Sequence, residues 1–77
     1  MKISQKTQET NVMRWNDEAN GVFACECDGR IVARVVRELK SWEWASYKGG
    51  WTHAAGKEAS FAEACKAAEA SVLSLKQ

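Results

Sequence analysis

The three cysteines and the single histidine are the side chains of this 77-residue chain best suited to metal chemistry. Cys25 and Cys27 form a C-x-C pair on a predicted strand, Cys65 lies on a predicted helix, and His53 lies on a later strand. Thiolates and imidazole are ligands that structural zinc prefers. Zinc ribbons and fingers, however, usually pair their cysteines as C-x₂-C at a turn. We therefore expect no metal or other cofactor, and keep a zinc set of Cys25, Cys27, His53 and Cys65 as the alternative.

Catalysis would need a nucleophile in contact with a base, and Cys65 with His53 is the pair that the sequence offers. No motif of a known reaction class surrounds either residue. A cysteine in an apolar core also keeps its proton and is a poor nucleophile. We therefore expect a protein that is not an enzyme, with its cysteines serving as small core residues.

Arginine and aromatic side chains supply the binding chemistry. Arg30 and Arg34 fall on one face of a predicted strand, and Tyr47 is expected to join them from the next strand. Arginine beside an aromatic ring on an open sheet suits recognition of carboxylates or nucleic acid. Trp15 and Trp51 lie near predicted turns, and exposed tryptophan is a frequent binding hot spot. The predicted binding residues are Arg30, Arg34, Tyr47, Trp51 and Trp15.

Acidic residues share the face on which these arginines lie, namely Glu26, Glu38 and Glu43. Over the whole chain, 11 basic and 10 acidic residues leave a formal charge of +1. Paired charges of both signs fit cross-strand ion pairs and a protein partner better than a phosphate backbone.

The segment from Ser60 to Leu75 predicts the one helix of the fold. An apolar stripe repeats at helical spacing, and Ser60 with Glu63 forms a capping box at its start. The middle of that stripe is small (Ala64, Cys65, Ala68), so the partner of this helix must bring bulky side chains. All four tryptophans precede the helix.

Turn signals divide the preceding chain into three to five antiparallel strands. The strands are expected near 12–15, 22–27, 30–38, 41–48 and 51–57, with Asp28-Gly29 and Gly49-Gly50 as hairpin turns. The predicted fold is α+β, an antiparallel meander sheet with one C-terminal helix on one face. The side chains expected to face the helix are Phe23, Cys25, Ile31, Ala33, Val35, Trp42, Trp44 and Trp51.

Length and composition predict one domain over residues 11–77, preceded by a flexible polar arm over residues 1–10. No apolar run approaches the length of a membrane span, and the N-terminus has no apolar core of a secretion signal. We therefore expect a cytoplasmic protein with reduced thiols and no membrane contact. It is expected to be a monomer, or a homodimer through an edge strand or the Ala70 face of the helix.

Three stretches together resemble a known class: CDGRIVARV, WEW and GKEASFAEACKAAEA, within residues 20–75. They are similar to the small strand–strand–strand–helix proteins of unknown function found in phages and mobile elements of proteobacteria. That class of size and layout includes anti-CRISPR proteins, so the resemblance implies an inhibitor that binds a host defence complex such as CRISPR–Cas. The layout also resembles DNA-binding domains such as the plant AP2 domain and the arm-binding domains of phage integrases. DNA binding by the outer sheet face, with Arg30 and Arg34, is therefore the alternative function.

Overall fold

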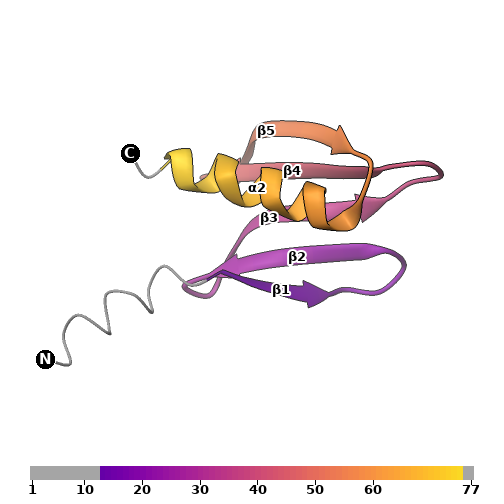
Figure 1. Ribbon diagram of the computed structural model, residues 1–77. Helices are drawn as coiled ribbons and strands as arrows, with labels where there is room; N and C mark the ends of the chain where they lie inside the picture. The colour runs from indigo at the N-terminus through magenta and orange to yellow at the C-terminus, as the bar shows by residue number, and fades with distance from the viewer. Residues whose placement is uncertain (1–12, 76–77) are drawn as a thin grey trace, which may run out of the picture.

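The computed structural model describes residues 13–75, and the predicted arm over residues 1–10 lies outside this range. Five strands precede one helix (Figure 1). The strands are β1 (Arg14–Asp17), β2 (Val22–Cys27), β3 (Arg30–Arg37), β4 (Trp42–Lys48) and β5 (Trp51–Glu58), and the helix is α2 (Phe61–Leu75). The predicted α+β class, an antiparallel sheet with one C-terminal helix, is confirmed.

Each strand of the sheet pairs antiparallel with its neighbour in the sequence, in the order β1-β2-β3-β4-β5. The two predicted hairpin turns are present. Asp28 and Gly29 have φ angles of 56° and 76°, and Gly49 and Gly50 have φ angles of 59° and 85°. Positive φ at both central positions is what a two-residue turn between twisted strands requires. The first strand begins and ends about two residues later than predicted, which keeps Trp15 within it.

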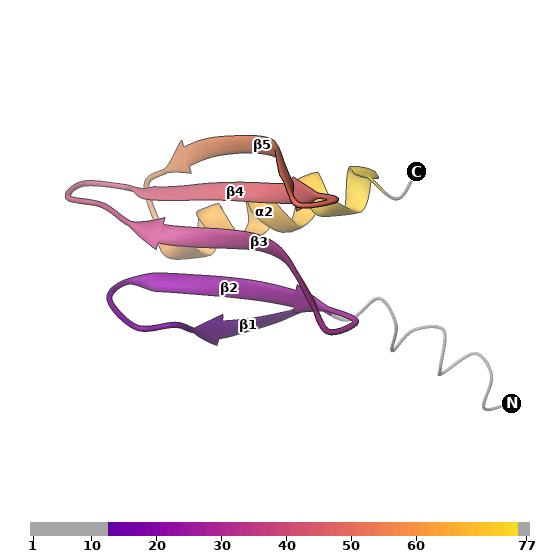
Figure 2. The same cartoon turned by 180° about the vertical axis from the view of Figure 1, so that it is seen from behind.

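The helix begins at its predicted cap, because the backbone N–H of Glu63 donates to Ser60 Oγ at 3.1 Å. Its small residues Ala64 and Ala68 are fully buried, and Val72 is buried with them. The helix lies on β3, β4 and β5 (Figure 1). Among residues 13–75, no helix lies on the opposite face of the sheet (Figure 2). No helix within residues 13–75 has both the length and the apolar character to cross a membrane.

Aromatic side chains of the sheet pack on the helix side: Trp15 and Trp44 pack against the core cluster that contains Ala68, and Phe23 and Trp42 lie against Phe61. The Phe61 ring lies 4.7 Å from Phe23 and 5.1 Å from Trp42, measured between ring centroids. Such tilted and edge-on pairs are favourable arrangements. The Trp44 ring covers Gly56, where a side-chain Cβ would come within 2.9 Å of the indole nitrogen. Gly56 therefore lets the Trp44 ring pack closely against β5. It marks neither a bulge nor the end of the strand.

A bulge in β3 corrects the predicted direction of two side chains. Cys25 pairs with Ala33 and Glu26 pairs with Ile31, so Val32 is an extra residue between the two pairs. Val32 therefore packs against the core beside Ala33, whereas Ile31 is 37% exposed. Strict alternation had assigned the opposite directions to Ile31 and Val32.

A second bulge interrupts the alternation of side chains in β5. The β4–β5 register shifts between Ser46 and Tyr47, which leaves His53 as the extra residue. Trp51 pairs with Lys48, which shares the helix-facing side of β4 with Ser46, so Trp51 keeps its predicted direction. Its side chain is nevertheless 79% exposed, and His53 is exposed as well. The fully buried Ser46 is held by the helix instead, with its Oγ 2.7 Å from Ser71 Oγ.

Candidate binding site

A cleft opens where the two hairpins of the sheet diverge. The β3–β4 ladder ends at the pair Ala33–Ser46, and the rest of β3 continues with β2 alone. The β2–β3 turn and the β4–β5 turn therefore separate, as the view from behind shows (Figure 2). The cleft has a volume of about 540 Å³ and is lined by residues 30–32, 34, 47–50 and Val72 of α2. We call it the fork.

The fork brings together three of the five predicted binding residues, Arg30, Arg34 and Tyr47. Trp51 directly follows Gly50, which also lines the fork, and its side chain is the most exposed of the tryptophans. The described lining includes three cations and no acidic residue. One end of the sheet thus combines arginine, tyrosine and tryptophan side chains around a recess.

Arg34 is fixed in the middle of the outer face by two partners. Its Nε donates to Glu18 Oε1 at 3.2 Å, and its guanidinium lies 5.9 Å from the centre of the Tyr47 ring. Hydrogen bonding to Tyr47 and to Glu18 raises the pKa of Arg34 above its usual value. The flanking positions in the ladder are Ala24 and Ala45, so nothing bulky competes with Arg34 for this part of the face.

Trp15 lies apart from the fork, unlike the other predicted binding residues. Its ring packs against the core, and its Nε1 donates to Glu69 Oε2 on α2 at 2.6 Å. The predicted partner surface around Trp15 is therefore occupied by the chain's own helix.

The alternative zinc ligands do not converge. Cys25 and Cys27 are buried on β2, whereas His53 is exposed on β5, with β3 and β4 between them. Within residues 13–75, no group of three or more His, Cys, Asp or Glu side chains is placed to hold a metal ion. His53 is exposed on β5, whereas Cys65, the other residue of the pair considered for catalysis, is partly buried on α2.

The thiols of Cys25 and Cys65 are held in the protonated form. Burial, with a smaller contribution from the Glu69 carboxylate, raises the pKa of Cys25 to about 12 and that of Cys65 to about 11. A thiol needs to ionise before it attacks an electrophile or binds a metal. Both side chains therefore act as apolar residues at neutral pH.

Comparison with known proteins finds no family model, no curated protein and no solved structure that matches this chain. Function must therefore be argued from the site itself.

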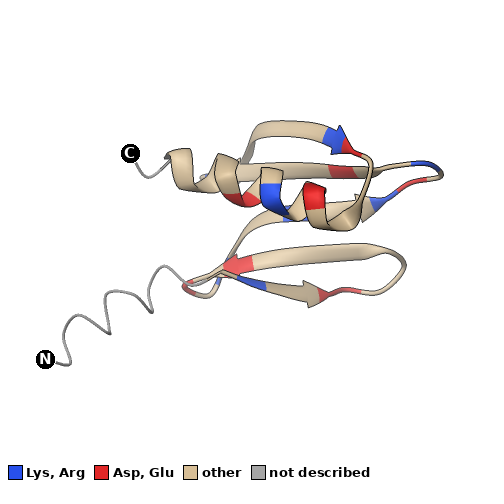
Figure 3. Ribbon diagram, viewed as in Figure 1, with Lys and Arg blue, Asp and Glu red and all other residues tan. Residues whose placement is uncertain are grey.

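Charged side chains of both signs are interspersed over the sheet and the helix (Figure 3). Two of the cations on or beside the outer face are paired, Arg34 with Glu18 and Lys57 with Glu38 at 3.3 Å. Glu43 stands next to Lys57 in the ladder. No continuous positive stripe forms along the described strands, and a duplex backbone would need one.

Six residues that line the fork are not among the predicted binding residues, namely Ile31, Val32, Lys48, Gly49, Gly50 and Val72. Strict alternation along the strand puts Val32 on the same face as Arg34, and Val72 falls on the apolar stripe of the helix, where a core role is expected. The one available signal for Lys48 was its position before Gly49-Gly50, since residues at the base of a hairpin turn lie at an end of the sheet.

Proposed function

We propose that this chain is a non-enzymatic protein-binding module that docks through the end of its sheet, with Trp51 as the anchor. The observation that carries this proposal is the 79% exposure of Trp51 at the same end of the sheet as the fork, which Arg30, Arg34 and Tyr47 line. Tryptophan, tyrosine and arginine are the residues that most often dominate binding energy at protein interfaces. A tryptophan left in water also exposes a large apolar surface that a partner can bury.

The mixed charge of the outer face supports a protein partner over a nucleic acid. Glu18 neutralises Arg34, and Glu38 neutralises Lys57. Phosphate binding gains its affinity from unpaired cations that displace counterions. Pairs of both signs instead suit a protein surface that carries its own charge pattern.

The small size of the chain and its strand–helix layout resemble phage inhibitors of bacterial defence, so a defence complex such as CRISPR–Cas is the first partner class to test. The chain would act by covering a surface of that complex.

A pull-down from nuclease-treated bacterial lysate tests the proposal with matched variants. We expect a stoichiometric protein partner to be retained by the wild-type chain and lost with Trp51→Ala. Leu39→Ala is the control, because Leu39 is fully exposed in the β3–β4 loop, at the end of β3 away from the fork. Retention of the partner by Trp51→Ala would contradict the assignment of the surface. Loss of all bound material on nuclease treatment would favour the DNA-binding alternative.

A further inference from the structure

The fork combines apolar and cationic side chains in one recess. Val32 and the buried Val72 provide apolar surface, whereas Arg30 and Lys48 are exposed beside the cleft. Gly49 and Gly50 leave open space on the hairpin side, since no atom lies within 4 Å of where a Cβ would be. A ligand could therefore reach the apolar surface without displacing a side chain at this turn.

The charged side chains that line the fork are positive, and only one of its three cations is in an ion pair with another described residue. Arg34 is paired with Glu18, but neither Arg30 nor Lys48 forms an ion pair with any other residue between 13 and 75. α2 ends at Leu75, shortly after the lining residue Val72, and a helix C-terminus carries a partial charge of roughly −0.5. Two unpaired cations outweigh that partial charge, so an anion is attracted rather than repelled.

We propose that the fork binds a small organic anion, a molecule with one carboxylate or phosphate group attached to an apolar body. The volume of about 540 Å³ falls within the range of roughly 300–1,000 Å³ that small-molecule sites occupy. Arg30 and Lys48 bind the anionic group, and Val32 and Val72 contact the apolar body. This inference goes beyond the proposed function, because the site requires no protein partner.

An NMR titration of the ¹⁵N-labelled chain tests this site with 4-phenylbutyrate and its neutral analogue 4-phenylbutyramide. We expect 4-phenylbutyrate to shift the amide signals of residues 30–32, 47–50 and 72, with a dissociation constant on the order of 1 mM for so small a probe. The amide should bind at least about fivefold more weakly, since it lacks the charge.

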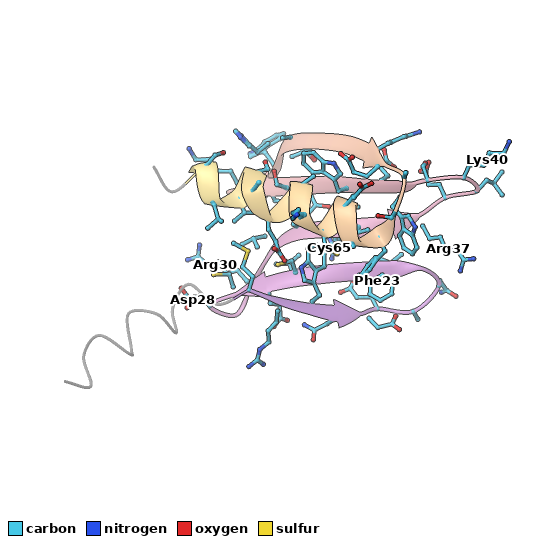
Figure 4. The ribbon with its side chains drawn as sticks, in the orientation of Figure 1. Phe23, Asp28, Arg30, Arg37, Lys40 and Cys65 are labelled. Carbon is cyan, nitrogen blue, oxygen red and sulfur yellow. The ribbon has the colours of Figure 1, made fainter. Side chains whose placement is uncertain are left out.

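Matched charge variants locate the anion. Arg30→Gln and Lys48→Gln should each weaken 4-phenylbutyrate binding by about three- to tenfold. Arg37→Gln and Lys40→Gln remove the same charges at the opposite end of the sheet and should leave binding unchanged (Figure 4). All four side chains are exposed, and the spectra themselves report whether each variant is folded.

Three results would overturn the site: shifts that map elsewhere, equal binding of acid and amide, or equal binding by fork and control variants. Adding 4-phenylbutyrate to the pull-down tests whether the natural anion belongs to the captured protein or to a free small molecule. Displacement of the captured protein would assign the carboxylate to that partner, and retention would assign it to a free small molecule. A negative titration leaves capture through Trp51 unaffected, so the two proposals stand or fall separately.

Discussion

Trp15 on β1 donates a hydrogen bond of 2.6 Å to Glu69 on α2, across 54 residues of sequence. β1 has four residues and pairs with β2 on one side only, so it is an edge strand with few ladder bonds of its own. The indole of Trp15 also packs against the core that contains Cys25 and Ala68. The Trp15 side chain therefore links the edge strand to the helix, through one hydrogen bond and through its packing against the core.

Replacing Trp15 with Phe should destabilise the protein by about 1–3 kcal/mol, because the ring is largely kept while the half-buried Glu69 carboxylate loses its donor. Glu69→Gln should cost less, since its amide oxygen still accepts from the indole. Urea denaturation measures both. Trp51→Phe is the control and should change the free energy of unfolding by less than about 0.5 kcal/mol, as expected for an exposed site. Equal losses in the free energy of unfolding for Trp15→Phe and Trp51→Phe would show that the Trp15–Glu69 hydrogen bond does not stabilise the fold.

Gly56→Ala should destabilise the protein by about 1–3 kcal/mol, because the new methyl group overlaps the Trp44 ring at 2.9–3.0 Å. Trp44→Leu should also be destabilising when it stands alone. In the double variant, the smaller leucine leaves room for the methyl group, so the combined loss should be less than the sum of the single losses. Strictly additive losses in urea titrations would mean that the contact with Trp44 is not the cause.

Ala19→Gly should stabilise the protein by about 1 kcal/mol, because Ala19 has a φ angle of 78°, which disfavours side chains with a Cβ. Its N–H bond to Asp17 Oδ1 and its carbonyl bond to Val22 do not involve the methyl group. The same exchange at Ala70, which is exposed within α2, should instead destabilise by about 1 kcal/mol. Thermal unfolding distinguishes the opposite signs, and a lower melting temperature for Ala19→Gly would refute the reasoning.

Raised thiol pKa values predict a loss of stability in alkaline solution. The pKa of Cys25 rises from its ordinary value of 9.0 to about 12, so the unfolded chain ionises this thiol first as the pH increases. The folded state then binds more protons than the unfolded state, and the free energy of unfolding falls as the pH rises from about 9 toward 12. Urea midpoints at pH 8 and pH 10.5 should therefore fall less in Cys25→Ala than in the wild type. An identical fall would exclude a contribution from Cys25.

The same pKa values predict slow alkylation of the folded protein. With the pKa of Cys65 at about 11, its reaction with iodoacetamide should accelerate about tenfold for each pH unit from 7 to 10, with no plateau near 9. Mass spectrometry of the native and urea-unfolded chain at each pH measures the rates. A plateau near pH 9 in the native protein would show that the thiol is solvated.

The elements of this fold could be predicted because each one has a local cause. Ser60 and Glu63 mark the start of the helix, and Asp28-Gly29 and Gly49-Gly50 adopt the positive φ angles that the turns demand. The small helix residues Ala64 and Ala68 likewise predict bulky partners, and Trp15 and Trp44 pack against the core cluster that contains Ala68.

The direction of side chains near the fork could not be predicted, because it depends on the register between strands. Val32 and His53 are ordinary strand residues in the sequence, and only the pairing with a neighbouring strand makes each an extra residue. The bulge in β3 reverses the assignment of Ile31, and the bulge in β5 leaves Trp51 on its predicted face but exposed. The cleft itself arises from the divergence of two hairpins, which no pattern within a single strand encodes.

The pairing of every strand with its neighbour in the sequence also bears on how quickly the chain can fold. Each hairpin closes a short loop, so the entropy cost of bringing its strands together is small. Proteins dominated by such local contacts fold faster than those that must first join distant segments. The long-range step is the docking of α2 on the sheet, together with the hydrogen bond between Glu69 and Trp15. This step joins α2 to β1, which lies farthest from it in the described sequence.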